Sequence, residues 1–596
     1  MEVAAETLEK PPEILPRNAM ADSPDAEDVK YPIKSANTNT PYIPAAPGYS
    51  RQDKIKDIED KIRAVEQRRE SSSSVACRTP GKSTPPGSSF VIRQPFCSSP
   101  MSNDGSEFSS TPSPPFMQDL VALRVLDSDL SSYPASGFPW IEAAMSRRLA
   151  SEGLDVHPNS LRSMLTIFMF RRGLTGYKLH TGRVLYNLST STKPILALLY
   201  SILLTACHFT QDMELKSWET ALLERTKSEI EANIALAHEY GSERYNSLYH
   251  LQAMLILSQY YFFKSRMLEG HVYTNSTIQF AIAMGIHRLD TRMIDRYATT
   301  IGSNSRSKWG YWQPRDSIEL GEAINLLWGC VARDLIGGVM NGLAPSLPPE
   351  EITTVWPFPL AAFVENSNLP GDHYSVKELL DPDSRTLVAD VSRDNAACLL
   401  IKALVLVYYA GNFDTERVSK PELTNEWWAR FEDCDGAIQK FIETIPPFDA
   451  GRSPEEVSHI VLAHTTIDCA TLQLHGALAE CELGTGTHGG SHPSDGLPGG
   501  RSYARCSAAC RNIVLVTAHL EGIDLSFMHM FIGVTWICAG SVLAKQIRWL
   551  RESGHSEQLQ TAEQDMLVLE RSMERYLKTY PVFNPWVEQL RAMRNW

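Results

Sequence analysis

The sequence predicts an all-α protein, and two observations support this prediction. From about residue 116 to the end, apolar residues recur every three or four positions, which is the spacing along one face of an α-helix. No segment shows the alternating apolar pattern of several strands joined by hairpin turns. Hydrophobic residues make up 43% of the 596 residues, which is enough for a large core.

The N-terminal part of the chain lacks this pattern except over one short stretch. Residues 1–50 are acidic and Pro-rich, and residues 71–115 form a Ser/Pro-rich linker, so we expect both to be disordered. Between them, residues 51–70 repeat apolar side chains at the a/d spacing of a coiled coil. These side chains are Ile55, Ile58, Ile62 and Val65. Two heptads are marginal alone, so a dimerising coiled coil and a solvated helix that frays both stay open.

Residues 116–596 are predicted to form one large helical domain. The run 195–209 is apolar nearly all round, which predicts a buried core helix. Residues 291–317 are polar and predict a surface loop, and the Gly-rich residues 484–501 predict a flexible one. Later helices are expected over 394–409, 426–444, 458–483, 501–520, 531–553 and 556–578.

Charge and cysteine usage limit the class of protein. The net charge of −14 argues against a nucleic-acid surface on the body of the chain, since such a surface needs a basic stripe. The odd count of 11 cysteines and the lack of a secretory signal fit a reducing compartment. Apolar runs such as 195–209 fall short of the roughly 18–20 residues of a membrane span. We therefore expect a soluble, intracellular protein without a membrane partner.

Motifs for catalysis or metal binding are absent from the sequence. No C-x2-C pair occurs, and Cys506 and Cys510 lie one helical turn apart without the further ligands that zinc needs. No zinc-protease, nucleophile-elbow or dinucleotide-binding motif is found. One acidic cluster is interpreted as a solvated helix face: Glu432, Asp433 and Asp435. Four histidines are interpreted as core or cap residues: His271, His287, His464 and His475. We expect no catalytic, cofactor or metal residue, and an all-α enzyme is a remote alternative.

Several short motifs follow one another in a specific order. They begin with MLTIFMFRRGLTGYKLHTGRVL (164–185) and LQAMLILSQYY (251–261). A helix then leads to a Gly-Ile-His-Arg-Leu box, followed by a Trp-x5-Asp helix and a Gly-x-x-Pro turn. The residues that define these last three motifs are Gly285, His287, Arg288, Trp328, Asp334, Gly342 and Pro345. An Ile-Thr-Thr-x-Trp-Pro tail ends the series at Pro357.

This order and spacing resembles the middle homology region of fungal zinc-cluster transcription factors, over roughly residues 116–410. The resemblance implies a nuclear regulator of RNA polymerase II transcription with a large helical regulatory domain. It also implies contacts with DNA and transcription co-regulators, a small-molecule effector, and a homo- or heterodimer formed through the coiled coil. We interpret the motif residues as determinants of the fold. If Asp334 forms a buried ion pair, its partner is expected to be Arg288 or Arg333.

The family also implies a six-cysteine zinc cluster upstream of the coiled coil, and residues 1–50 occupy that place instead. Zinc and DNA binding are therefore implied only if an upstream cysteine cluster exists. Otherwise the protein makes no DNA contact of its own. The alternative function is then an adaptor or corepressor that forms heterodimers with zinc-cluster partners.

Overall fold

The structure is a computed structural model, and the residues that it describes all lie in the second of two units, Ser109–Trp596. The described ranges are 136–190, 195–238, 245–290, 312–364, 375–380, 388–419, 423–449, 452–484 and 500–594. The predicted arm, coiled coil and linker fall outside these ranges. So do residues 291–311 and 485–499, which hold most of the two predicted loops.

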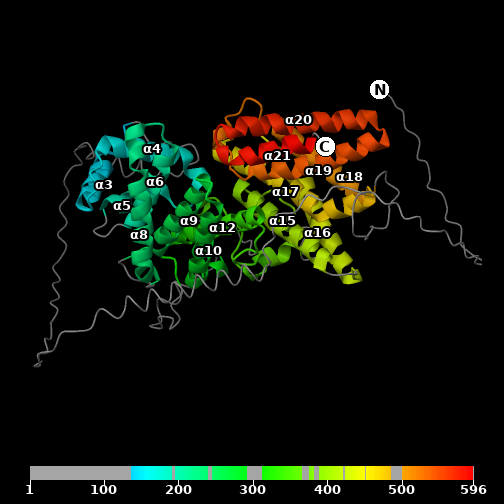
Figure 1. The fold of residues 1–596 in the computed structure, drawn as a ribbon. Coiled ribbons are helices and arrows are strands. Elements are labelled where there is room, and N and C mark those ends of the chain that lie inside the picture. Colours follow the sequence, from blue (N-terminus) through cyan, green and yellow to red (C-terminus); the bar gives the residue numbers. More distant parts are fainter. Residues whose placement is uncertain are drawn as a thin grey trace, which may run out of the picture. The chain divides into compact units, whose positions relative to one another are not determined.

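The fold is all-α in the residues that the structure describes, as the sequence predicted (Figure 1). The first helices are α3 Pro139–Ser151, α4 Pro158–Arg171, α5 Thr181–Thr190, α6 Leu196–Phe209, α7 Met213–Ser217, α8 Glu219–His238, α9 Ser247–Phe263, α10 Met267–Met284 and α12 Ser317–Asn341. The later helices are α13 Leu360–Val364, α15 Ala396–Ser419, α16 Asn425–Thr444, α17 Pro454–Glu482, α18 Arg501–Ala518, α19 Ile532–Ser553, α20 Ser556–Leu577 and α21 Asn584–Arg594. Short 3-10 turns are η1 Arg172–Thr175, η2 Ile286–Arg288, η3 Pro349–Glu351, η4 Val376–Leu379, η5 Leu525–Phe527 and η6 Pro581–Phe583.

The helices expected from apolar periodicity are confirmed with small shifts at their ends. Helix α15 continues further than expected, to Ser419. No range was predicted for α3, α7, α8, α13 or α21. By length and composition α15 could cross a membrane, contrary to the expectation that the apolar runs of the chain are too short. Of the apolar window in α15, 67% is buried against other parts of the protein, which is typical of a core helix.

The two halves of the helical series have their own packing partners. Helix α12 packs against α9, α10, α13 and α15, and α10 lies along α9. In the C-terminal series α17 packs between α15 and α18, while α19 contacts α20 and α21. Figure 1 shows these last helices running side by side. Helices α12, α15 and α17 thus form the interior, and the elements that meet around them shape the site described below.

The family motifs fold into one connected structure that we call the motif clasp, formed by residues 286–289 and 353–355. Gly285 ends α10 with a φ of +79°, a left-handed conformation that glycine adopts without strain, and the chain turns there into η2. The backbone N–H of Thr353 and of Thr354 then donates to His287 O, at 3.0 and 3.2 Å. The extended Ile-Thr-Thr-x-Trp tail is thereby held against the end of α10.

Trp328 joins α12 to the motif clasp. Its indole Nε1–H donates to Val355 O at 2.7 Å, and its ring stacks on Trp356 with centroids 5.0 Å apart. Both rings are almost fully buried. A tryptophan supplies apolar area and one donor at the same time, so a single side chain fixes both the distance and the register between helix and tail.

We expect Trp328→Phe to lower the free energy of unfolding by about 2–4 kcal/mol, because Val355 O loses its donor and the smaller ring leaves a void. Urea unfolding of the full chain, followed by circular dichroism, measures the loss. Trp218→Phe is the control, since Trp218 is only partly buried. An equal loss in the two variants would contradict a special role for the indole N–H.

Candidate functional site

A cavity of about 230 Å³ lies along one face of α12. The lining of this cavity is contributed by segments that are far apart in the sequence. These are residues 172–181, 325–336, 357–360, 395–401 and 453–459, together with His529. The motif clasp positions one wall, because residues 357–360 follow directly after Trp356. The rest of the lining includes the beginnings of α15 and α17.

The loop from Gly176 to Lys178 is held against α12 by an amide on α9. The buried Gln252 accepts the Lys178 backbone N–H at 2.8 Å and donates to Gly176 O at 3.3 Å. Gly329 of α12 faces this loop: a Cβ there would lie in van der Waals contact with the Lys178 side chain, at 3.4 Å. Gln252 is the one amide in the apolar LQAMLIL motif. A single polar residue on a buried helix indicates a buried hydrogen bond, and this was not predicted.

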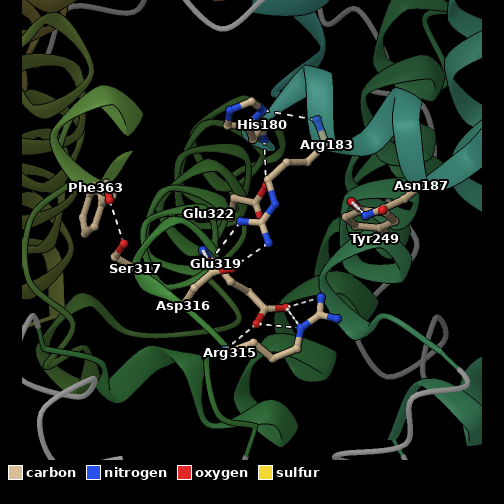
Figure 2. Close-up of polar contacts among 10 residues, drawn as sticks. All are labelled: His180, Arg183, Asn187, Tyr249, Arg315, Asp316, Ser317, Glu319, Glu322 and Phe363. Carbon is tan, nitrogen blue, oxygen red and sulfur yellow. Dashed lines mark hydrogen bonds and ion pairs between the residues drawn. The ribbon is translucent and has the colours of Figure 1, made fainter. Parts of the chain in front are cut away.

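The far end of this loop is tied to the first turns of α12 by a polar network (Figure 2). The backbone N–H of His180 donates to Glu322 at 2.8 Å. Arg183 on α5 forms two bonds to Asp316, at 3.0 and 2.9 Å. Burial raises the pKa of Glu322 to about 7, opposed by the His180 N–H and by Arg183 and reinforced by Glu319. The network therefore fixes the loop while keeping one carboxyl near its titration point at neutral pH.

Arg333 is the buried cation of the cavity. Its exposed fraction is 5%, and burial lowers its pKa to about 10. One nitrogen contacts His529 Nε2, and another donates to Leu174 O at 3.2 Å. Its Nε has no acceptor, and no carboxylate of the described residues lies within ion-pair distance of the guanidinium. Arg333 is thus a charged group in the interior with only neutral partners.

The other ionisable groups around Arg333 add little negative charge. The Lys178 ammonium lies 4.0 Å from the Glu455 carboxylate, and burial lowers the pKa of Lys178. Burial, reinforced by Lys178, also lowers the pKa of His459 to about 4. Burial, reinforced by Arg333, lowers the pKa of His529 as well. Both imidazoles are therefore neutral at pH 7, and the cavity keeps an excess of positive charge.

Asp334 forms neither of the ion pairs considered from the sequence. Its Oδ2 accepts the backbone N–H groups of Ser346 and Leu347 at 2.7 and 3.2 Å. Arg288 is exposed on η2, and Arg333 points into the cavity lining. Neighbouring residues on a helix do not face each other, which explains why Arg333 is not the partner. Asp334 instead anchors the loop that follows α12.

The predicted motif residues are divided between the cavity and its frame. Trp328 lines the cavity. The other motif residues lie outside its lining: Gly285, His287, Arg288, Asp334, Gly342 and Pro345. Gly342 ends α12 in the left-handed conformation, and His287 accepts the clasp hydrogen bonds through its backbone. From the sequence, Arg333 was considered only as a partner for Asp334. Because it lies within an apolar helical run, it could have been predicted to be a buried cation at a site.

Asp435 does not lie on a solvated helix face, as the interpretation of the acidic cluster had predicted. Its exposed fraction is 2%, and its carboxylate pairs with Arg501 at 2.7 Å and with His475 at 3.2 Å. His475 also contacts Ser502 Oγ at 3.1 Å, so Ser, His and Asp lie in one row. All three are buried, and none lines the cavity. We interpret the row as a polar link between α16, α17 and α18.

Zinc, which the family resemblance implied, finds no ligand set in the part of the chain that the structure describes. The cysteines there are free thiols, and Cys506 and Cys510 are buried in α18. No group of three His, Cys, Asp or Glu side chains in the described ranges is placed to hold a metal ion.

Comparison with known families matches one segment of the chain. Residues 178–386 match the model of the fungal specific transcription factor domain. This segment is therefore similar to a domain of transcription factors. No curated protein and no solved structure gave a match. The matched segment contains Lys178, Trp328 and Arg333, while α15, α17 and His529 complete the cavity from beyond it.

We expect Glu322→Gln to change the pH dependence of stability. The folded pKa of about 7 exceeds the ordinary value of 4.5, so between these values the folded protein holds a proton that the unfolded chain has released. Wild-type stability therefore falls as the pH rises through this window and levels off above it. Glutamine keeps an acceptor for the His180 N–H and should gain about 2–4 kcal/mol on the wild type between pH 5 and pH 8.

Urea unfolding at pH 5, 6, 7 and 8 measures this gain. Glu552→Gln is the control, since the Glu552 side chain is 65% exposed. A wild-type-to-variant difference that stays constant across this range would contradict the raised pKa.

Proposed function

We propose that the helical domain is the regulatory part of a nuclear transcription regulator and that a small-molecule effector in the cavity controls it. The observation that supports this proposal is the composition of the cavity lining. It joins a loop of the matched domain to the start of α17, where Lys178 meets Glu455. An effector held there would contact both segments at once.

Such an effector would act by favouring one arrangement of these segments over another. A ligand shifts a conformational equilibrium only as far as its affinities for the two states differ. The cavity lining is suited to this, because residues 172–181 and 453–459 meet at the Lys178–Glu455 ion pair, whose charged atoms are 4.0 Å apart. The fully buried Trp328 and the motif clasp would serve as the fixed frame.

DNA contact, in this proposal, lies outside the helical domain. A dimer formed through residues 51–70 would bring the domain to DNA, either with a second copy or with a DNA-binding partner. The second candidate, an adaptor or corepressor, is favoured by the net charge of −14 and by the lack of any C-x2-C pair in the sequence. The two candidates differ in whether the chain alone reaches a promoter.

We expect the full chain, fused to a heterologous DNA-binding domain, to change transcription of a reporter by several-fold and to accumulate in the nucleus. In the fusion, the heterologous DNA-binding domain brings the regulatory domain to the promoter, so the chain needs no DNA contact of its own. Reporter activity is compared with that of the DNA-binding domain alone and of a fusion to an unrelated helical protein. A promoter of intermediate strength shows activation and repression equally well. Unchanged transcription in a nuclear, folded fusion would reject the proposal.

A separate experiment distinguishes the two candidates. The tagged chain is purified from fungal cells, and its complexes are tested for zinc-cluster proteins before and after deletion of residues 51–70. An adaptor should lose such a partner with the deletion. A regulator that carries its own DNA contact should be found on chromatin without any such partner.

A further inference from the structure

We propose that the ligand of the cavity is a small organic monocarboxylate whose carboxylate pairs with Arg333 and whose apolar body packs against Trp328 and Leu400. This proposal rests on the proposed function, since it takes the cavity as the effector site. The proposal goes beyond the proposed function because it names the charged group of the ligand, the protein residue that pairs with this group, and the size of the ligand.

The unpartnered charge of Arg333 is the first argument. A guanidinium removed from water is costly unless an anion or a full set of acceptors compensates for it. Arg333 donates to one carbonyl, and its Nε is buried without an acceptor. His529 is a weak partner, because its other ring nitrogen accepts the Phe531 N–H at 3.2 Å and a neutral imidazole accepts at only one nitrogen. A carboxylate at the cavity side of Arg333 would supply the missing charge and acceptor.

Nearby protein carboxylates are already engaged elsewhere. Glu455 lies next to Lys178, and its side chain packs against Gly173, where a Cβ would come within 2.8 Å of it. Glu456 belongs to the first turn of α17 and contacts Ser453 Oγ at 3.2 Å. Asp334 is turned away toward the backbone of Ser346. The charge that compensates Arg333 must therefore come from a bound molecule.

The chemistry of the site favours a carboxylate over a phosphate. One buried guanidinium matches a monoanion, and its planar fork fits a carboxylate with two parallel hydrogen bonds. A phosphate dianion would need further donors. Lys178 lies next to Glu455, Arg172 donates to Thr181 Oγ1 at 3.5 Å, and the two imidazoles nearby are neutral. The lining also includes apolar side chains that an organic body could contact: Trp328, Ile336, Phe358, Leu360, Leu400 and Ile401.

The size of the cavity limits the ligand to a small metabolite. Its volume of about 230 Å³ is below the roughly 300–1,000 Å³ of pockets for drug-sized ligands. Gly176 lies at the charged end, where a Cβ would be in van der Waals contact with the Arg333 guanidinium, at 3.4 Å. A branched or aromatic acid of five to ten carbons has this combination of one charge and a compact apolar body.

We expect 4-methylpentanoate and 3-phenylpropanoate to raise the Tm of the purified full chain, while 4-methylpentanamide and 3-phenylpropanamide leave it unchanged. The acid and its amide have the same shape, so their difference isolates the charge. Isothermal titration at constant ionic strength gives the Kd values. Arg333→Gln should weaken acid binding by about 10- to 100-fold, since a hydrogen-bonded charge pair is lost. Arg333→Lys should keep part of it.

Arg548→Gln is the matched control, because the Arg548 side chain is 68% exposed and does not line the cavity. The comparison of acid with amide in the wild type keeps the test valid even where the Arg333 variants fail to fold. Three results would overturn the proposal: no acid binds, the amides bind as well as the acids, or inorganic phosphate binds with the same dependence on Arg333. Reporter assays report separately on the proposed function, so each idea can fail alone.

Discussion

Every ionisable group that α12 brings into the core needs a partner from another segment, and this requirement organises the domain. Glu319 accepts from Arg315, and Glu322 accepts the backbone N–H of His180. Asp334 accepts the amides of the loop after the helix. The contacts of Glu322 and Asp334 hold two different segments against this helix, so burial of charge fixes where these segments lie. Arg333 on this helix faces the cavity, and its buried Nε has no acceptor.

Apolar periodicity was enough to predict the helices and the all-α class, because the pattern of burial along a helix is a local property of the sequence. The motif residues were interpreted as determinants of the fold, and Gly285 indeed ends α10 while Trp328 is buried. The same pattern cannot reveal which residues meet across the fold. Residues Lys178 and Glu455 approach each other only because α12 and α17 bring their segments to one cavity.

The two polar positions that the sequence analysis misjudged have a common physical cause. A carboxylate on a helix is expected in water, because burial without a partner is costly, and Asp435 departs from this only because Arg501 and His475 compensate for it. Asp334 was given a charged partner for the same reason, while backbone amides fulfil that role. Gln252 was overlooked since an amide carries no charge, yet it holds the loop on which the cavity depends.

The cavity crosses the boundary of the segment that matches the family, with Arg333 on one side of residue 386 and Leu400, His459 and His529 on the other. Deletion mapping is therefore a poor guide to this protein. A fragment that stops near residue 386 would lose one wall of the cavity and expose the apolar face of α12 that α15 covers. A change in activity in such an allele would reflect a damaged core. Only point substitutions can distinguish the loss of an inhibitory segment from the loss of the cavity wall.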